Sequence, residues 1–222
     1  MQFVYHENAG MALLHVELRA YEHLFKVRRM GLGDVSQWRN LNDAMLHTYT
    51  LESMGKKEAI LRWEASGDIP LIPSKHVHLA WCVIDPKMIE KTLPMLNELG
   101  VSKISFVYAE FSQKSHKLDY ERMKRIVINS CQQCGRTSMM ELEEFKNLKT
   151  YLEAYPKSTV IDFCEQKWDA NDALESILVG PEGGFSTKER TLLRSNRVLG
   201  LTCNAILRSE TAVLSVAAKI LA

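Results

Sequence analysis

Polar and apolar residues alternate along the first third of the chain. The alternation is clearest in four segments: HVEL at 15–18, DVSQWRN at 34–40, MLHTYTLES at 45–53 and EAILRWEAS at 58–66. A period of two is typical of strands with one buried face, and the intervening glycine and asparagine residues indicate turns. The pattern predicts a small antiparallel barrel or sandwich over residues 1–66. The stretch GDIPLIPSK at 67–75 holds two prolines and a glycine, which predicts a linker.

From residue 76 the pattern changes to apolar runs separated by helical periodicity. Five runs are predicted to be strands: 76–84, 103–109, 158–164, 175–180 and 197–201. Continuous apolar strands that alternate with helices are typical of a mostly parallel sheet covered on both faces. The sequence therefore predicts an α/β domain over residues 76–222.

Local signals mark the helices between these strands. Asp85 and Pro86 form a start signal and Gly100 a stop signal for a first helix, in which Pro94 should cause a kink or an interruption. Three more helices are expected: one over 119–134 that ends at Gly135, one that starts at the capping box of Ser186 and Glu189, and one over 209–222.

Composition narrows the function classes. The formal net charge of the 222 residues is +1, so any RNA-binding surface has to be a local patch. No run of 18 apolar residues and no signal-peptide pattern is present, and a cytoplasmic location is expected. The five cysteines are odd in number and scattered, which favours free thiols. Cys131 and Cys134 lack a second ligand pair at zinc-site spacing, so no metal is expected.

The glycine-rich segment GPEGG at 180–184 lies between a predicted strand and a predicted helix. It is either a tight turn or a ligand loop in which the main chain approaches its ligand closely. No Lys-Ser/Thr pair follows, which excludes a phosphate loop, and the spacing does not fit a dinucleotide fingerprint. A neutral or cationic ligand held by backbone groups remains open.

A second segment, LGLTCNAILRSETA at 199–212, leads into the last helix. Ser209 is expected to be the N-cap of that helix, and Glu210 suits its positive end. Arg208 has no such structural role, and an arginine at a loop–helix junction favours a carboxylate, phosphate or base edge as its partner.

Together these segments resemble the RsmE family, whose members methylate N3 of a uridine in 16S ribosomal RNA. GPEGG followed about 25 residues later by ILRSETA is a specific signal. ELGVSKI at 98–104, CQQCGR at 131–136 and HLFKVRRMGLGD at 23–34 are similar to further motifs of the family. The resemblance spans nearly the whole chain and implies a trefoil-knotted SPOUT α/β domain, with a mostly parallel sheet, preceded by a PUA-like β-barrel.

The resemblance also implies S-adenosylmethionine (SAM) as the cofactor, bent and gripped by main-chain groups of the knot. The residues that it implies for cofactor binding are Leu178, Gly180, Pro181, Glu182, Gly183, Gly184, Leu199, Gly200, Leu201, Asn204, Ile206 and Leu207. The small residues Ala212, Ser215, Ala217 and Ala218 would let the last helix pack close to the knot and to the second subunit of a homodimer.

Uracil N3 carries a proton at neutral pH, so the reaction needs proton removal, stabilisation of the anion, or both. The catalytic candidates are Arg208 for charge stabilisation, Glu210 as a base, and Arg136 for contact with the RNA. Candidate RNA contacts are Lys26, Arg28 and Arg29 in the barrel, and Lys103, Lys114 and Lys117 in the second domain. His76 and His78 are expected to serve ordinary packing. The expected partner is 16S rRNA in the assembled small ribosomal subunit.

Other readings remain. The chain could be another knotted RNA methyltransferase that acts on a ribose 2′-OH or a guanine. It could also be a non-catalytic RNA-binding protein in which the knot only dimerises. An adenylate- or NAD-binding enzyme is a weaker third alternative.

Overall fold

The computed structural model describes residues 2–27, 29–71, 73, 75–113, 117–169, 174–203 and 205–222, with the side chains of residues 18, 19, 23, 26 and 27 outside that description. The chain forms two compact units. Unit 1 comprises Met1–Ile72 and Ile128–Met139, and unit 2 comprises Pro73–Val127 and Met140–Ala222.

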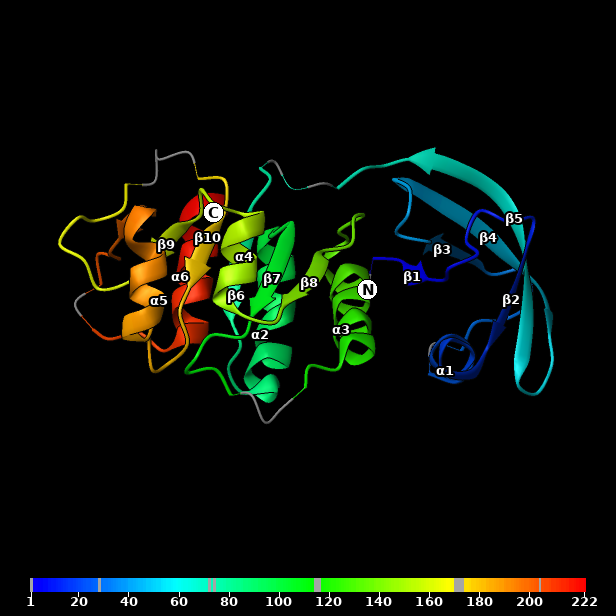
Figure 1. Ribbon diagram of the computed structural model, residues 1–222. Coiled ribbons are helices and arrows are strands. Elements are labelled where there is room, and N and C mark those ends of the chain that lie inside the picture. Colours follow the sequence, from blue (N-terminus) through cyan, green and yellow to red (C-terminus); the bar gives the residue numbers. More distant parts are fainter. Residues whose placement is uncertain are drawn as a thin grey trace. The chain divides into compact units, whose positions relative to one another are not determined.

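Unit 1 is built on a curled five-stranded sheet in the order β1-β3-β4-β5-β2. Its strands are β1 (Val4–Tyr5), β2 (Leu13–Glu17), β3 (Val35–Arg39), β4 (Met45–Met54) and β5 (Glu58–Asp68). Every pair is antiparallel except β1 with β3. Register shifts interrupt the pairing of β4 with β5 at two points, and Figure 1 shows both strands strongly curved. The antiparallel pairing predicted for this part of the chain is confirmed for β2, β3, β4 and β5.

One face of this sheet carries the core of unit 1. In β2 only Leu14 and Val16 are buried, which is the alternation that a period of two predicts. A helical segment, α1 (Leu18–Tyr21) continuing as the π-helix η1 (Glu22–Val27), was not predicted. Its Tyr21, Leu24 and Phe25 are buried at helical spacing, so a helical pattern was present inside a region dominated by alternation.

Unit 2 contains a six-stranded parallel sheet in the order β11-β9-β10-β6-β7-β8. The strands are β6 (His78–Cys82), β7 (Lys103–Val107), β8 (Glu141–Phe145), β9 (Thr159–Ile161), β10 (Ile177–Val179) and β11 (Val198–Leu199). Every residue of β6, β9 and β10 is buried, because helices cover both faces of the sheet. The predicted parallel α/β domain is confirmed. The acidic edge strand β8 was missed because its residues ELEEF are only partly buried.

The helices are α2 (Pro86–Leu99), α3 (Tyr120–Cys134), α4 (Leu148–Ala154), α5 (Thr187–Leu192), which continues as the 3-10 turn η2 (Leu193–Ser195), and α6 (Ser209–Leu221). Asp85 caps α2 by accepting a hydrogen bond from Lys87 N–H, and Gly100 ends it at a φ of 99°. The sequence predicted a kink or an interruption at Pro94. The helix runs through Pro94, so no interruption occurs. Burial of Ile89, Leu93 and Leu96 on one face holds the helix together across the missing N–H.

The two faces of the parallel sheet carry different helices. Ala80 and Cys82 of β6 join a core that includes Leu148 and Tyr151 of α4. Trp81 lies between them in the strand and therefore points to the opposite face, where its indole reaches α6. In Figure 1, α6 is the red helix beside β10. This arrangement brings the start of the last helix to the carboxyl ends of the central strands.

Candidate functional site

The glycine-rich segment is the turn that follows β10. Gly184 N–H donates to the Pro181 carbonyl at 2.9 Å, and Gly184 itself has a φ of +66°. A Cβ on Gly180 would lie 3.1 Å from the Phe185 ring, and one on Gly183 would lie 3.1 Å from Phe111 Cβ. The glycines therefore let two aromatic side chains pack against the main chain of the turn, in addition to permitting a positive φ.

The capping box predicted after this turn is confirmed. Ser186 Oγ accepts a hydrogen bond from Glu189 N–H, and Glu189 Oε2 accepts one from Ser186 N–H at 3.0 Å. The other carboxylate oxygen of Glu189 accepts from Glu110 N–H at 2.8 Å, after β7. The start of α5 is thereby fixed to the sheet, and the glycine turn is held at both ends.

The segment after β11 lies against the segment after β9. Gly200 N–H donates to the Gln166 carbonyl at 2.8 Å, and Trp168 N–H donates to the Gly200 carbonyl at 3.0 Å. A Cβ on Gly200 would lie 2.4 Å from the Cys164 carbonyl oxygen, a distance that real Cβ atoms do not adopt. Glycine at position 200 is thus required for these two strand-end loops to pair.

Ser209 joins the last helix to the glycine turn. Its hydroxyl donates to the Gly180 carbonyl at 2.7 Å and accepts from Trp81 Nε1 at 2.9 Å, and the residue is buried. The prediction that Ser209 is the N-cap is wrong. Arg208 is at the N-cap of α6 and makes no side-chain cap bond. The Ser209 hydroxyl does not cap the helix because it is engaged by the sheet and the turn.

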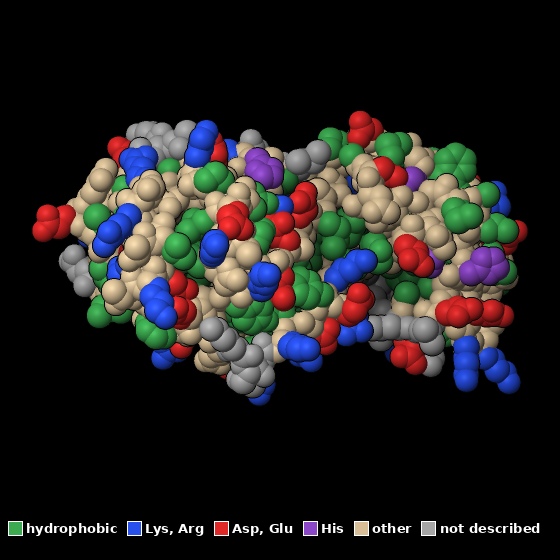
Figure 2. Space-filling model, viewed as in Figure 1, with side chains coloured by type: hydrophobic (Ala, Val, Ile, Leu, Met, Phe, Trp, Pro, Cys, Tyr) green, Lys and Arg blue, Asp and Glu red, His purple; other side chains and the backbone are tan. Residues whose placement is uncertain are grey.

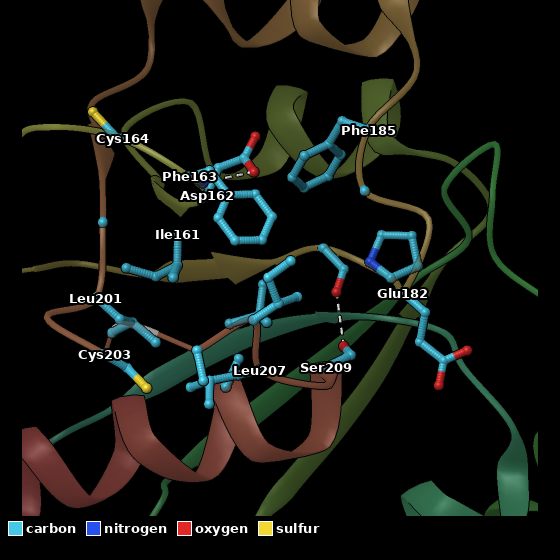
Figure 3. A pocket seen from close by; sticks show the side chains of 18 of the residues that line it. Ile161, Asp162, Phe163, Cys164, Glu182, Phe185, Leu201, Cys203, Leu207 and Ser209 are labelled. Carbon is cyan, nitrogen blue, oxygen red and sulfur yellow. Dashed lines mark hydrogen bonds between the residues drawn. The ribbon is translucent and has the colours of Figure 1, made fainter.

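These three strand-end segments enclose a pocket, shown in Figure 3. Its lining comes from residues 161–164 and 167, from 179–182, 184 and 185, and from 200, 201, 203, 205–207, 209 and 212. The walls are mainly apolar side chains and backbone, with Phe163 and Phe185 on one side and Leu201 and Leu207 on the other. A site at the carboxyl ends of parallel strands is where α/β sheets bind ligands.

Most of the predicted cofactor residues meet at this pocket. Those that line it are Gly180, Pro181, Glu182, Gly184, Gly200, Leu201, Ile206 and Leu207. Gly183, Leu178 and Leu199 do not line it, and the last two are fully buried neighbours of lining residues. Asn204 lies outside the described residues. Sequence reasoning missed the wall after β9, including Asp162, Phe163 and Cys164. The signal that could have found these residues is that they lie at the end of the strand predicted over 158–164.

The catalytic candidates occupy two different units. Arg208 is exposed beside the pocket residues Leu207 and Ser209. Glu210 is buried, and its Oε2 has no hydrogen-bond partner among the described residues. Arg136 belongs to unit 1, where its Nε donates to Ser138 Oγ at 3.3 Å. Burial lowers the pKa of the Arg136 guanidinium, against the opposing effect of Cys131 and Cys134.

The end of α3, which carries the CQQCGR motif, contributes to unit 1. Gln132 accepts hydrogen bonds from Gln2 N–H at 2.7 Å through its carbonyl and from Tyr5 N–H at 2.8 Å through its side chain. No disulfide joins Cys131 and Cys134. Within the described part of the chain, no group of three potential metal ligands comes together.

The predicted RNA-contacting cations differ in their surroundings. Arg29 is exposed, whereas the side chain of Lys26 and the whole of Arg28 and Lys114 lie outside the described residues. Lys117 is exposed, but Lys103 is engaged by Glu143 at 3.0 Å and by Tyr155 at 2.9 Å. Figure 2 shows basic and acidic side chains interspersed on the face it draws, in keeping with the small net charge.

The two candidate packing histidines behave differently. His78 is buried, its Nε2 lies 2.6 Å from Ser105 Oγ, and its ring packs edge-on against Tyr155. Burial, reinforced by the charge of Lys103, lowers the pKa of His78 to about 4. His76 precedes the strand and is exposed, so its predicted packing role is wrong. The strand begins two residues later than the apolar run suggested.

Known proteins resemble this chain over nearly its whole length. A sequence model described as an RNA methyltransferase domain matches residues 72–221. The ribosomal RNA small subunit methyltransferase E of Helicobacter pylori is 42% identical over 98% of both chains.

None of the helices in the described part of the chain has the length and apolar composition needed to cross a bilayer.

Two solved structures share the fold. A protein of Legionella pneumophila, described as a methyltransferase and solved with SAM bound, has a TM-score of 0.82 and is 25% identical, with 97% of this chain and 96% of that one covered. A protein of Thermotoga maritima, described as a predicted RNA methyltransferase, has a TM-score of 0.77 and is 26% identical, with coverage of 100% and 97%. With the family match and the 42% identity, these likenesses show that the chain belongs to the ribosomal RNA small subunit methyltransferase E family.

Proposed function

We propose that this protein transfers a methyl group from SAM to N3 of a specific uridine in 16S ribosomal RNA. One observation carries the proposal. In a chain of this family, the glycine turn and the segment before α6 meet at a pocket lined by backbone and apolar side chains. A similar structure from Legionella pneumophila was solved with SAM bound.

The lining residues fit an adenosine that carries a short charged tail. Leu201, Ile206 and Leu207 offer apolar surface to a purine. Gly180 and Gly184 line the pocket without a side chain, and the space beside each that a Cβ would occupy is taken by Phe185 and by Arg190. Glu182 places a carboxylate at the pocket, suited to a ligand with cationic groups. SAM supplies a methyl group already activated by a sulfonium charge, so no metal is required.

The residues of the chain would act on the acceptor base. Arg208, exposed at the start of α6, is positioned to stabilise negative charge on a uracil oxygen. Glu210 is the candidate base, and its buried Oε2 has no hydrogen-bond partner among the described residues. Fixing α6 to the glycine turn through Ser209 orients both side chains relative to the pocket, and orientation alone can lower the barrier substantially. Arg136 is buried, so a contact with the RNA would require its guanidinium to become accessible.

We further propose that unit 2 carries a trefoil knot of the SPOUT type. Gly200, at the β11 edge of the sheet, is hydrogen-bonded to residues 166 and 168. The chain then crosses to Gly180, which follows the more central strand β10, and α6 begins there. Lys219, near the end of α6, donates to the Trp168 carbonyl at 2.6 Å. The chain thus returns to the loop after β9 on both sides of residues 201–208, which supports threading of the C-terminal segment. The small residues Ala212, Ser215, Ala217 and Ala218 would let α6 pack close to the knot and to a second subunit of a homodimer. Ala217, which is fully buried in the single chain, would serve the packing within the knot.

For the N-terminal part we propose a PUA-like RNA-binding barrel over residues 1–66, a linker over 67–75 and the methyltransferase domain over 76–222. The last strand of the barrel, β5, runs into the proposed linker as far as Asp68. The curled sheet of unit 1 supports the barrel assignment. Lys26, Arg28 and Arg29 would contact the phosphate backbone of 16S rRNA in the assembled small subunit, where contacts to phosphates position the protein.

The test is nucleoside mass spectrometry of 16S rRNA from a deletion strain, with and without the gene restored. Loss of N3-methyluridine on deletion and its return on complementation are expected. Persistence of N3-methyluridine with loss of a 2′-O-methyl or guanine mark would establish another knotted methyltransferase. Calorimetry with SAM provides the second measurement, because a non-catalytic RNA-binding protein would give no binding heat.

A further inference from the structure

Asp162 is held by two other segments of the chain and by its own neighbour Phe163. Its N–H donates to the Leu199 carbonyl at 3.2 Å, at the end of β11. Its Oδ1 accepts from Phe163 N–H at 2.8 Å, and its Oδ2 lies 2.6 Å from Nη1 of Arg190 on α5. The Asp162 side chain is only 12% exposed. Both carboxylate oxygens are therefore engaged at the wall of the pocket that sequence reasoning missed.

Arg190 reaches Asp162 from a fixed base. The preceding residue, Glu189, is buried and anchors the first turn of α5 to Glu110 and Ser186. A Cβ on Gly184 would lie 3.8 Å from Nη2 of Arg190, so the guanidinium lies beside the main chain of the glycine turn. Arg190 thus spans from the glycine turn to the loop after β9.

These contacts connect two walls of the same pocket. Asp162 and Phe163 line it from the loop after β9, and Gly184 and Phe185 line it from the glycine turn (Figure 3). The two walls come from strands β9 and β10, whose pairing ends at Ile161 and Val179. Beyond those residues, in the described part of the two loops, no sheet hydrogen bond fixes the distance between the walls.

We propose that Asp162 and Arg190 form a positioning pair that sets the separation of the two walls for the cofactor. The inference rests on the proposed function in one respect, which is that SAM is the ligand. Neither residue is assigned a chemical step. The ion pair holds Phe163, which is 79% exposed, at the pocket, where a bound ligand would cover its ring.

The rival explanation is an ordinary surface ion pair. The Arg190 side chain is 56% exposed, and pairs of that kind contribute little to stability. Such a pair would alter the melting temperature slightly and leave ligand affinity unchanged. If the pair positions the walls, removing either member weakens SAM binding. Because the two members act together, their effects do not add in the double variant.

Four variants of the full-length protein separate these cases. Asp162→Asn removes the charge without changing shape, Arg190→Gln removes the partner, and the double variant completes a cycle. Lys188→Gln is the matched control, since Lys188 is an exposed cation on the same helix. The dissociation constant of SAM is measured by calorimetry at 50 and 500 mM NaCl, together with the melting temperature.

Each single variant is expected to raise the dissociation constant about 5- to 10-fold, and the double variant no further than either single one. The control should stay within about 2-fold of the wild type, and high salt should weaken SAM binding in the wild type more than in the double variant. If Asp162→Asn does not fold, Arg190→Gln and Arg190→Lys decide the question, since Arg190 is exposed.

Unchanged SAM affinity in the variants, or effects that add in the double variant, would overturn the positioning role. In either case, SAM binding by the wild type would leave the proposed function standing. Failure of the wild type to bind SAM would overturn both.

Discussion

The hydroxyl of Ser209 donates a hydrogen bond to the carbonyl of Gly180 across 29 residues of sequence, at 2.7 Å. The same oxygen accepts the indole N–H of Trp81 from the central strand β6. One buried hydroxyl therefore ties the two sequence motifs that mark the family, GPEGG and ILRSETA, to each other and to the sheet. This link makes the two segments a single site.

Replacing Ser209 with alanine should affect both stability and ligand binding. The change leaves Trp81 Nε1 and the Gly180 carbonyl without this partner, which costs about 1–3 kcal/mol when such groups are buried. We expect a lower free energy of unfolding in urea and weaker SAM binding by calorimetry. Ser215→Ala is the control, because among the described residues the Ser215 hydroxyl bonds within its own helix, to the Thr211 carbonyl. Equal effects of the two changes would contradict the proposed link.

Gly200 should tolerate no side chain. Its Cβ would lie 2.4 Å from the Cys164 carbonyl oxygen and 3.2 Å from Lys167 Nζ. Gly200→Ala is expected to destabilise the protein by about 3 kcal/mol or more, because main chain must move to relieve the overlap. Gly31→Ala is the matched control, since a Cβ there meets nothing within 4 Å. Chemical denaturation measures both, and a neutral Gly200→Ala would refute the close approach.

Arg208 is expected to act on the acceptor base and not on the cofactor. Arg208→Ala should lower kcat by about 100-fold, the scale typical of losing one charge-stabilising donor, while the dissociation constant of SAM stays within about 2-fold. Arg208→Lys should recover only part of the rate, because an ammonium cannot present two parallel donors. Transfer of a labelled methyl group to small ribosomal subunits gives the rates. A large loss of SAM affinity with unchanged kcat would instead place Arg208 in the cofactor site.

His78 should make stability depend on pH. Its pKa is lowered to about 4 in the folded protein, by burial first and then by Lys103, with Glu143 opposing. The unfolded chain, in which an ordinary histidine has a pKa near 6.5, binds the proton more tightly. Stability is therefore constant above about pH 6.5 and falls as the pH drops from there toward 4, by about 1–2 kcal/mol after solvent screening.

Urea unfolding of the wild type and of His78→Gln at pH 7.5, 6 and 5 tests this prediction. The difference in unfolding free energy between the two proteins should shrink as the pH falls, because only the wild type loses the contribution of the neutral imidazole. Glu143, whose pKa is lowered by hydrogen bonds from Ser105, Lys103 and Tyr155 against its own desolvation, adds a further loss at more acid pH in both proteins. Parallel curves would contradict the assignment.

Sequence patterns alone located the strands and helices of unit 2 other than β8 and α4, because buried parallel strands are apolar on both faces and helix caps use distinctive residues. It also located two of the three pocket segments, because the glycines of GPEGG and the arginine before the last helix are unusual where a strand leads into a helix. The edge strand β8 and the helical segment α1–η1 escaped because their patterns were weak or embedded in another period.

Which strand ends meet is set by the pairing of the strands in the folded sheet. Residues 161–167 carry no motif, and they reach the pocket because β9 pairs with β10 and β11 in the sheet. The sequence assigned Ser209 to a helix cap, whereas its real partners lie 29 and 128 residues away. The physical reason is that local patterns record which residues prefer a helix, a strand or a cap, while the partner of a buried polar group is set by packing between segments distant in the chain.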